Sequence, residues 1–408
     1  MSQDTFCPYP WSNLMVAMDG TCRVCCKTYH TVKDESGHPL KSQTTSLNEI
    51  WMAKDLQNFR RDLSSGVARS ECQSCWKEER AGRKSHRQIA IESDWFPKVN
   101  PSEKVEPPTS LDLKLSNLCN LKCRICGPEY SSKWISDYEN LRGKPDPYFR
   151  SFSKTSFLGT PERKQQLIEW LPRLRRLELF GGETLLNPEF YEILELCVDS
   201  GRASQISLFS NTNGTVFNDR LGPLLNKFEK VYLGLRLDDI GDRFEYQRKG
   251  AKWPQVQACL KGFESIASDR IQIKLAPTIS VLNVFYLDEI LTWMRTHTKL
   301  PIYLNVLHDP AQYAIANLPM AVKEEVISNL RKIPGEENRI AQFEIEALCQ
   351  LMSQNRGSDR FFHDFQSMTL RLDQIRQEDF FKTFPRIVEG FERHGFALKA
   401  SPALHENA

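Results

Sequence analysis

Three closely spaced cysteines constrain this chain more than any other feature of its sequence. Cys119, Cys123 and Cys126 stand in a C-x3-C-x2-C pattern directly after a short apolar run that predicts a strand. Three thiolates at this spacing fit on one loop around a cubane, and a 4Fe-4S cluster usually takes four thiolates. Three ligands therefore leave one iron open for chemistry. Zinc is the alternative, but a structural zinc site takes four ligands, and no fourth Cys or His stands nearby in the sequence.

Strand-like and helical runs alternate through the middle of the chain, after Val105–Thr109, where two consecutive prolines interrupt regular structure. This alternation predicts an α/β fold with right-handed βαβ crossovers and a parallel sheet. In such folds the residues that do chemistry collect at the carboxyl ends of the strands. The predicted strands are Leu111–Leu115, Leu177–Phe180, Ile206–Phe209, Val231–Leu237, Ile271–Leu275 and Ile302–Val306. The predicted helices between them are Arg163–Leu171, Phe190–Val198, Pro254–Ile266 and Tyr286–Arg295.

The chain is expected to divide into three units. Residues 1–100 are irregular and rich in cysteine, except for one amphipathic helix predicted over residues 47–65. Residues 110–310 form the α/β unit. Residues 318–408 are predicted to be a helical extension, whose aromatic segment at 380–385 docks on the α/β unit, because exposed aromatics would leave a sizeable apolar patch. The predicted helices of the extension are Ala321–Leu330, Gln342–Met352 and Phe361–Leu372.

Composition indicates a cytoplasmic protein whose cysteines bind metal. The formal charge is only +2, so no strong overall field favours nucleic acid or membrane. The first residues lack the basic and apolar regions of a signal peptide, and no apolar run approaches the roughly 20 residues that span a bilayer. Twelve cysteines in a reducing compartment are not expected to form disulfides, and their clustering indicates metal.

A second group of cysteines lies in the first eighty residues. An Asp-Gly turn between two short predicted strands indicates a hairpin, and a C-x2-C pair follows farther along the chain. Two thiolates from the pair and two from the hairpin region would complete a closed four-cysteine site. By ligand type alone, zinc and iron–sulfur fit such a site equally well. The group consists of Cys7, Cys22, Cys25, Cys26, Cys72 and Cys75.

The C-x3-C-x2-C loop resembles the signature of the radical S-adenosylmethionine (SAM) superfamily. The resemblance implies that Cys119, Cys123 and Cys126 bind a 4Fe-4S cluster, whose fourth iron is chelated by the amino and carboxylate groups of SAM. It also implies a partial (β/α)6 radical SAM barrel over roughly residues 110–310. Ile125 departs from the family pattern, which often has an aromatic residue at this position, near the adenine.

The activity that the resemblance implies is reductive cleavage of SAM. A low-potential electron donor such as flavodoxin or ferredoxin would reduce the cluster, and cleavage would give a 5′-deoxyadenosyl radical that abstracts hydrogen from the substrate. The cofactor supplies this chemistry, while the protein supplies placement and excludes water. The substrate is left open between a peptide, a sugar and a nucleotide metabolite, and no catalytic acid or base is assigned.

Residues after the second strand resemble the family motif that holds the amino group of SAM. Gly181 and Gly182 let the backbone approach a ligand, and Glu183 can accept from an ammonium. Thr184 stands where relatives often have Pro. An ordinary turn is the alternative interpretation.

Residues after the later strands resemble further SAM contacts. Ser210 and Asn211 follow the third strand, where the family places polar side chains on the SAM carboxylate or ribose; a tight turn is the alternative. Asp238 resembles a ribose or substrate contact, although Arg236 stands where relatives commonly have Ser. Arg248 resembles an arginine that pairs with the SAM carboxylate, and a surface salt bridge is its alternative. Asn283 and Asn305 either face SAM or the substrate or cap loops.

The N-terminal cysteines resemble those of SPASM and twitch domains, which carry auxiliary iron–sulfur clusters. Cys7, Gly20 and Cys25 match the C-x9–15-G-x4-C element of these domains. Most relatives carry this unit after the barrel, whereas here it comes first. The resemblance implies one auxiliary cluster, of the 4Fe-4S or 2Fe-2S type, with Cys22 and Cys26 as rivals of Cys25. The implied ligands are Cys7, Cys25, Cys72 and Cys75.

Two other classes of protein compete with the enzyme. An iron–sulfur electron carrier or redox sensor would never cleave SAM, but a Gly-Gly-Glu motif after the strand that follows the cysteine loop favours the enzyme. A zinc-stapled scaffold or nucleic-acid module is disfavoured by the weak net charge and the absence of paired histidine ligands. Cys197, Cys259 and Cys349 stand singly in apolar helical runs and are expected only to pack.

Overall fold

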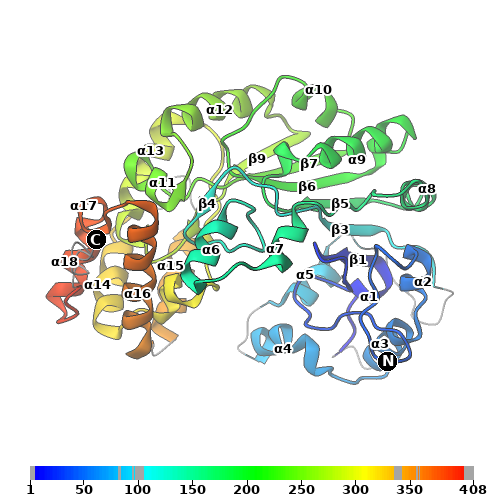
Figure 1. Ribbon diagram of the computed structural model, residues 1–408, viewed down its shortest axis with the longest axis horizontal. Coiled ribbons are helices and arrows are strands. Elements are labelled where there is room, and N and C mark those ends of the chain that lie inside the picture. The colour runs from blue at the N-terminus through cyan, green and yellow to red at the C-terminus, as the bar shows by residue number, and fades with distance from the viewer. Residues whose placement is uncertain are drawn as a thin grey trace.

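A sheet of seven strands forms the centre of the protein in the computed structural model (Figure 1). The structure describes residues 5–80, 84–93, 96, 105–334, 342–354, 357 and 359–398. The strand order is β2-β1-β3-β5-β6-β7-β9, and every pairing is parallel except that of β1 with β2. The strands are β1 (Asn13–Val16), β2 (Cys22–Arg23), β3 (Ser110–Lys114), β5 (Arg176–Phe180), β6 (Ser207–Thr212), β7 (Lys230–Leu235) and β9 (Ile271–Leu275). The mixed α/β class with its parallel sheet agrees with the prediction.

The sixth predicted strand differs from the structure. Residues 302–306 were expected to form one continuous strand, but only an isolated bridge between Ile302 and Leu275 continues the main sheet. The strand β11 (Asn305–Val306) pairs instead with β10 (Thr278–Ile279). Prolines explain the interruption, because Pro277 and Pro301 have no N–H to donate and contribute only carbonyl acceptors to the pairing.

Helices cover the sheet between its strands, close to the predicted positions. They are α8 (Pro161–Trp170), α9 (Pro188–Asp199), α12 (Trp253–Ile266) and α13 (Leu287–His297). Thr160 and Asn187 cap α8 and α9 through their side chains, and a proline follows each cap. Capping satisfies amide groups that have no partner in the first helical turn, and proline is tolerated there. These caps start each helix two residues before the predicted start, which rested on the apolar pattern.

The N-terminal segment is part of the same sheet, which the sequence did not predict. The strand β1 pairs in parallel with β3, so the β1–β2 hairpin extends the sheet of the α/β unit. The hairpin turns at Gly20, whose φ of 80° favours glycine. The remaining helices of this segment are α1 (Tyr9–Ser12), α2 (Leu47–Trp51), α3 (Lys54–Ser64), α4 (Gln73–Arg80) and α5 (His86–Glu92).

The single helix predicted over residues 47–65 is wrong, because the chain forms α2 and α3 with a break at Ala53. Ala53 is extended, with a ψ of 141°. The break leaves Trp51 buried, with its indole nitrogen donating to the carbonyl of Glu106 at 2.7 Å and its ring packed against Trp170. A continuous helix would extend the local periodicity, but this tertiary contact outweighs it.

The C-terminal extension is helical and packs against the α/β unit, as Figure 1 shows. Its aromatic segment is buried as expected, with the ring of Phe384 4.9 Å from that of Tyr246 and Phe380 5.6 Å from Phe365. The expected unit boundary at residue 100 and the last residues, 399–408, lie outside the described part of the chain. The helices are α14 (Met320–Leu330), α15 (Gln342–Gln354), α16 (Asp359–Arg376), α17 (Phe380–Thr383) and α18 (Pro385–Arg393).

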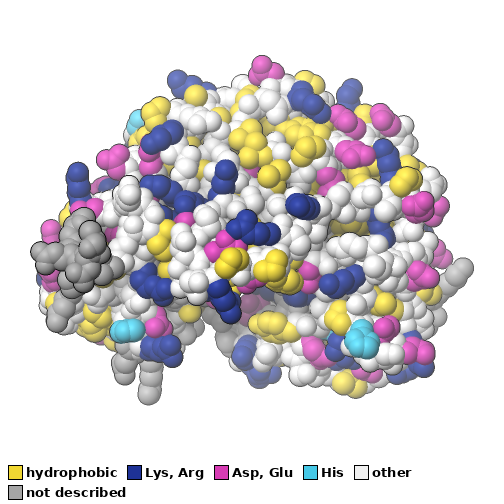
Figure 2. Space-filling view, in the orientation of Figure 1, with side chains coloured by type: hydrophobic (Ala, Val, Ile, Leu, Met, Phe, Trp, Pro, Cys, Tyr) yellow, Lys and Arg dark blue, Asp and Glu magenta, His cyan; other side chains and the backbone are white. Residues whose placement is uncertain are grey.

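The surface carries both signs of charge. Figure 2 shows basic and acidic side chains interspersed over one face, in agreement with the small net charge. In the part of the chain that the structure describes, no helix combines the length and apolar character that crossing a membrane would need.

Candidate functional site

A cavity of about 600 Å³ lies at the carboxyl ends of the strands, and we call it the mouth cavity. Its wall includes all three cysteines of the C-x3-C-x2-C loop, here called the cluster loop (Cys119–Cys126). The ends of β5, β6 and β7 and the short strands β10 and β11 supply much of the rest. The strand ends therefore carry the candidate chemistry, as expected for a parallel α/β fold.

The cluster loop is fixed by a short antiparallel pairing. The strand β4 (Lys122–Cys123) pairs with β8 (Arg248–Lys249), which places Cys123 opposite Arg248. The Nη1 atom of Arg248 lies 3.8 Å from the Cys123 Sγ. A hydrogen bond from Cys126 lowers the pKa of Cys123 to about 7 against the opposing effect of burial, and the charge of Arg248 also lowers it. The same hydrogen bond raises the pKa of Cys126, and burial raises that of Cys119 to about 12, so of the three thiols only Cys123 is shifted toward the thiolate that binds metal.

Asp238 holds Arg248 in place. One carboxylate oxygen accepts from Arg248 Nε at 3.1 Å and from Nη2 at 2.7 Å, and the other accepts from the backbone N–H of Thr278 at 2.8 Å. Burial opposes the charge of Arg248, but Asp238 and the nearby thiols hold its pKa above the usual value. The structure therefore brings together two residues that were predicted separately, with Arg248 lining the cavity and Asp238 supporting it from behind. Asn283 caps this loop by donating to the Asp238 carbonyl at 2.8 Å.

The two glycines after β5 allow the strand end to pack against the cluster loop. A Cβ atom would lie 2.6 Å from the Ser116 carbonyl oxygen if built on Gly181. One built on Gly182 would lie 2.3 Å from the Leu118 carbonyl oxygen. The backbone N–H of Gly182 donates to Ser116, and both glycines line the mouth cavity. The sequence identified the need for close approach, and the structure shows that one partner is the loop itself.

Glu183 is buried and its carboxylate already accepts several hydrogen bonds. Thr212 Oγ1 donates at 2.7 Å, the Asn213 backbone N–H at 2.6 Å and the Leu185 backbone N–H at 3.2 Å. Burial raises the pKa of Glu183, while these donors act in the opposite direction. Glu183 therefore orders the end of β6 beside the cavity.

Of the two residues predicted at the end of β6, only Asn211 lines the mouth cavity. The hydroxyl of Ser210 donates to the Leu179 carbonyl at 2.7 Å within the sheet. Asn211 extends over Gly234, where a Cβ would lie only 2.3 Å from the Asn211 Oδ1. Thr212 and Asn213, the next residues along the chain, also line the cavity.

Several residues of the cavity wall were not predicted. Met18 belongs to the N-terminal hairpin, and its presence depends on the unexpected pairing of β1 with β3. Lys114 and Arg236 stand at the ends of strands, a position that could have identified them. Asn305 also lines the wall, which is the first of the two roles expected for it. The other unpredicted wall residues are Ile125, Tyr130, Phe180, Thr212, Asn213 and Thr278.

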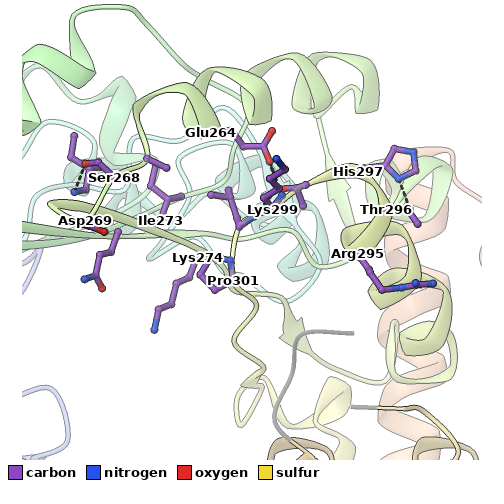
Figure 3. A pocket seen from close by; sticks show the side chains of 15 residues that line it. Glu264, Ser268, Asp269, Ile273, Lys274, Arg295, Thr296, His297, Lys299 and Pro301 are labelled. Carbon is purple, nitrogen blue, oxygen red and sulfur yellow. Dashed lines mark hydrogen bonds between the residues drawn. The ribbon is translucent and has the colours of Figure 1, made fainter. Parts of the chain in front are cut away.

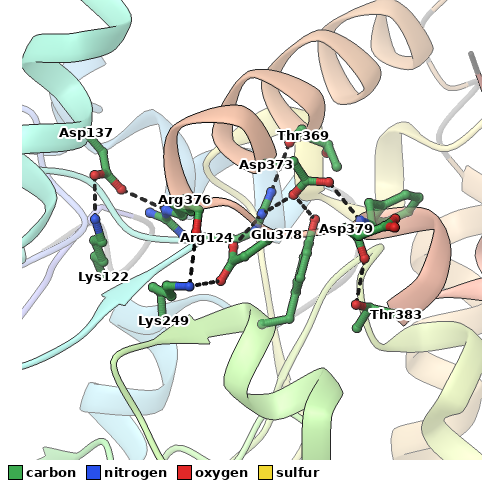
Figure 4. Close-up of polar contacts among 12 residues, drawn as sticks. Lys122, Arg124, Asp137, Lys249, Thr369, Asp373, Arg376, Glu378, Asp379 and Thr383 are labelled. Carbon is green, nitrogen blue, oxygen red and sulfur yellow. Dashed lines mark hydrogen bonds and ion pairs between the residues drawn. The ribbon is translucent and has the colours of Figure 1, made fainter. Parts of the chain in front are cut away.

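The C-terminal extension contacts the cluster loop through buried ion pairs (Figure 4). Arg124 has a fully buried side chain and pairs with Asp373 and, at 2.7 Å, with Glu378. Arg376 lies 2.7 Å from Asp137, which also pairs with Lys122 at 2.6 Å. Both basic residues of the loop that flank Cys123 are therefore fixed by acidic groups. We call this set of contacts the loop clamp; it comprises Lys122, Arg124, Asp137, Asp373, Arg376 and Glu378.

A second pocket contains four of the N-terminal cysteines. Cys7, Cys25, Cys72 and Cys75 all line it, together with aromatic residues such as Phe59 and Trp76, and its wall has no carboxylate. Burial raises the pKa of Cys72 to about 11 and raises those of Cys7 and Cys25 further. These four were the predicted ligands, and we call the site the four-cysteine pocket.

The two rivals of Cys25 point elsewhere. Cys22 is fully buried on β2 and does not line the four-cysteine pocket, and Cys26 is exposed. The charged groups that act on Cys26 include Asp112, Lys114 and Glu178, which belong to β3 and β5. Cys26 thus faces the α/β unit while its neighbour Cys25 faces the pocket.

Both cysteine groups have the donor chemistry of iron–sulfur sites. Thiolates are the usual ligands of such clusters. Among the described residues, no group of Cys, His, Asp and Glu converges as ligands of a single metal ion. A single zinc ion needs all its thiolates within roughly 2.3 Å of one point, whereas a cubane distributes its ligands over four irons. The seven thiols that line the two pockets supply the ligand type that iron–sulfur clusters take.

A larger cavity, of about 810 Å³, lies elsewhere and contains no cysteine (Figure 3). It is formed by the ends of α12 and α13 and by β9, with Glu264, Lys274 and Arg295 in its wall. Glu264 already accepts from Thr298 and from the Lys299 backbone N–H. Volume alone therefore does not identify the functional site. The three cysteines of the cluster loop line the mouth cavity and not this larger one.

Comparison with known families gives two matches. Residues 113–271 match the radical SAM superfamily, and residues 7–76 match the SPASM iron–sulfur cluster-binding domain. Together the two matches cover more than half of the chain. All three cysteines of the cluster loop lie within the first match, and the four-cysteine pocket takes its cysteines from the second.

Individual relatives are distant. The chain is 22% identical over 262 residues to the uncharacterized protein MJ0907 of Methanocaldococcus jannaschii, covering 62% of this chain and 82% of that protein. It is 23% identical to a GTP 3′,8-cyclase of Syntrophomonas wolfei, covering 48% and 53%. It is similar to a solved structure of native anSMEcpe with bound AdoMet, at 19% identity and a TM-score of 0.40, covering 64% and 66%. The chain thus spans about half of the cyclase and about two thirds of the solved chain.

Proposed function

Because the chain belongs to the radical SAM superfamily and carries a SPASM iron–sulfur cluster-binding domain, we propose that it cleaves SAM reductively at a 4Fe-4S cluster on Cys119, Cys123 and Cys126. It is an enzyme of this superfamily, and the two domains imply a 4Fe-4S cluster and SAM as cofactors. The observation that supports the proposed site most directly is that all three thiols line one cavity at the carboxyl ends of the strands.

When bound, the cluster and SAM supply the electron transfer and the radical chemistry, and the chain's own residues hold and shield them. Arg248 places a fixed positive charge beside Cys123, and Asp238 keeps it there. Such groups around a cluster tune its potential and orient its ligands. Gly181 and Gly182 allow the strand end to approach the loop closely, and Asn211 provides a polar group in the same wall.

We propose that Glu183 helps to bind the amino group of SAM from a position behind the wall of the mouth cavity. Its carboxylate accepts from Thr212 and Asn213, and Thr212 and Asn213 themselves line the mouth cavity. A carboxylate has about four acceptor sites, so three internal donors leave room for one more. Ser210 is proposed to act only through the order of the β6 end, since its hydroxyl is engaged within the sheet.

The four-cysteine pocket is proposed to hold one auxiliary iron–sulfur cluster on Cys7, Cys25, Cys72 and Cys75. Its wall offers four thiols and no carboxylate, which suits an all-thiolate centre. Residues 1–100 would then be the auxiliary unit, residues 110–310 the barrel and residues 318–408 a support for the cluster loop. A flavodoxin- or ferredoxin-like protein is the proposed electron donor, and the substrate is proposed to be a peptide, a sugar or a nucleotide metabolite.

The proposal is tested by anaerobic reconstitution of the full chain, followed by assays of iron, sulfide and 5′-deoxyadenosine with dithionite and SAM. We expect about eight irons in the wild type and about four when Cys119, Cys123 and Cys126 are all changed to Ala. The variant should form no 5′-deoxyadenosine. The control is Cys259→Ala, which removes a thiol that lies in α12, outside both sites.

Other outcomes distinguish the competing classes. About six irons in the wild type would indicate a 2Fe-2S auxiliary centre. Iron that binds fully without 5′-deoxyadenosine would favour an electron carrier. Zinc in place of iron would contradict the proposal.

A further inference from the structure

One guanidinium in the mouth cavity has no acidic partner. Arg236 follows β7 and is partly buried, and its side chain makes one long contact, from Nη1 to the Ala276 carbonyl at 3.4 Å. Among the described residues, no carboxylate lies within 4 Å of it. Asp238 lies only two residues along the chain, but its carboxylate accepts hydrogen bonds from Arg248 and from the Thr278 backbone N–H. Arg236 is therefore an uncompensated cation in a recessed place.

The rest of the cavity wall does not balance this charge. The charged side chains in the wall are Lys114, Arg236 and Arg248, and no Asp or Glu belongs to it. Lys114 is neutralised by Asp112 at 2.7 Å and Arg248 by Asp238 at 2.7 Å. Of these three wall cations, Arg236 alone remains unpaired. Burial lowers the pKa of Arg236, and the charge of Asp238 offsets only part of this effect, so the charged form would be stabilised further by a bound anion.

The neighbours of Arg236 in the wall add hydrogen-bond donors. Asn305 lines the same cavity, and its amide nitrogen makes only a long contact of 3.5 Å to the Thr278 hydroxyl. A guanidinium presents paired N–H groups that match a carboxylate or a phosphate, and an amide can add another donor. A cation and an amide facing one cavity favour an anionic ligand over a neutral one.

We propose that Arg236, assisted by Asn305, binds an anionic group, a carboxylate or a phosphate, on the substrate of this enzyme. The inference rests on the proposed function and deepens it by naming the charge of the substrate. SAM also has a carboxylate, but Arg248 is the arginine that contacts a thiol of the cluster loop, and among the described residues no contact joins Arg236 to any of these thiols. Arg236 is therefore assigned to the substrate, which must enter the cavity in addition to SAM.

The test measures anion and SAM binding separately on the reconstituted full-length protein. Glutarate and inorganic phosphate are titrated by calorimetry into the SAM-loaded protein at constant ionic strength. We expect at least one of them to bind the wild type, to bind Arg236→Gln about tenfold more weakly or worse, and to recover partly in Arg236→Lys. The SAM dissociation constant should change less than about twofold in both variants. Arg220→Gln, which removes a surface ion pair with Glu195, is the matched control.

The outcomes separate the possible errors. A preference for glutarate or for phosphate identifies which anion the substrate carries. A SAM dissociation constant raised about tenfold in Arg236→Gln, with anion binding unchanged, would assign Arg236 to SAM and overturn the proposal. Failure of both anions to bind the wild type would also overturn it. Formation of 5′-deoxyadenosine by the wild type is read independently, so loss of the proposed function is not confused with loss of the anion subsite.

Discussion

The cluster loop and the four-cysteine pocket use the same ligand beside very different volumes of open space. Three cysteines of the loop line a cavity of about 600 Å³. Four cysteines of the pocket are packed with aromatic and aliphatic side chains and with Lys27, His86 and Arg87, around a space of about 20 Å³. A site with one ligand too few beside a cavity can take a substrate or cosubstrate, whereas a closed set of ligands serves structure or electron transfer. The number of cysteines and the space beside them thus distinguish the two sites.

The two sites also differ in what holds them in place. The four-cysteine pocket is built from residues 7–87 alone, without any contribution from the C-terminal extension. The cluster loop depends on the loop clamp, in which Arg124 pairs with residues about 250 positions later in the chain. Long-range support of this kind makes the loop sensitive to changes in the C-terminal extension, and the pocket should be indifferent to them.

The largest expected effect comes from single changes at the cluster loop. Cys123→Ser should abolish 5′-deoxyadenosine formation, because a cluster with two remaining thiolates is not held in the geometry that SAM needs. Iron in the four-cysteine pocket should stay at about four per chain. Anaerobic iron analysis and product chromatography check both statements. Loss of all iron would show that the two sites do not assemble independently, and would contradict the contrast drawn between them.

A change at the four-cysteine pocket should have the complementary effect. Cys72→Ser should lower the iron content by about half and leave SAM cleavage by dithionite at the same order of magnitude. The thiol of Cys72 lines the pocket and does not belong to the wall of the mouth cavity. Equal loss of SAM cleavage in Cys72→Ser and Cys123→Ser would contradict the separation of roles.

The loop clamp should contribute strongly to stability. Arg124→Met leaves Asp373 buried without its cation and leaves Glu378 with Lys249 alone, and removing one partner of a buried ion pair costs about 3–5 kcal/mol. Urea unfolding followed by fluorescence measures the loss. The combined change Arg124→Met, Asp373→Asn should recover part of it, because residue 373 then carries no unpaired charge. An Arg124→Met variant as stable as Arg220→Met, at an exposed ion pair, would refute the clamp.

Arg376 should affect the potential of the cluster more than its assembly. Its guanidinium is buried, pairs with Asp137 through Nε and lies over the ring of Trp134, which donates to the Cys123 carbonyl at 2.6 Å. A buried positive charge near a cluster favours its reduced, more negative state. Arg376→Gln should therefore shift the reduction potential to a more negative value, measured by a redox titration followed by electron paramagnetic resonance. An unchanged reduction potential with normal iron content would show that Arg376 does not tune the cluster.

Local signals explain what could be predicted from the sequence. The parallel strands were found because β3, β5, β6, β7 and β9 are short apolar runs. The helices α8 and α9 were found from their apolar pattern, and their predicted starts lie two residues after the observed ones, which Thr160 and Asn187 fix as caps followed by proline. The cysteines of the loop were identified by spacing alone. The Asp238–Arg248 pair was identified only as two separate candidates, since nothing in the sequence shows that β4 and β8 pair.

Features that depend on distant contacts were missed. The pairing of β1 with β3 joins segments separated by almost a hundred residues, and Met18 reaches the mouth cavity only through it. The loop clamp joins segments about 250 residues apart. Ser210 and Asn211 show a smaller difference, because the motif named both, whereas the hydroxyl of Ser210 is engaged within the sheet and only Asn211 of the two lines the cavity. Residue type and spacing find ligands, but they do not find the groups that support them.

The smallest expected effect concerns two adjacent cysteines and tests how sharply the four-cysteine pocket is defined. Cys25 lines the pocket, whereas Cys26 is exposed and faces charged residues of β3 and β5. Cys26→Ser should therefore leave the iron content and the absorption spectrum unchanged, while Cys25→Ser should lose the iron of the pocket. The two variants replace sulfur by oxygen at adjacent positions, so general damage to the hairpin would affect both alike. If Cys26→Ser lost iron and Cys25→Ser did not, Cys26 rather than Cys25 would be the ligand. Equal partial loss in both would mean that the pocket accepts either thiol, and the contrast between a closed pocket and an open loop would then rest on the cluster loop alone.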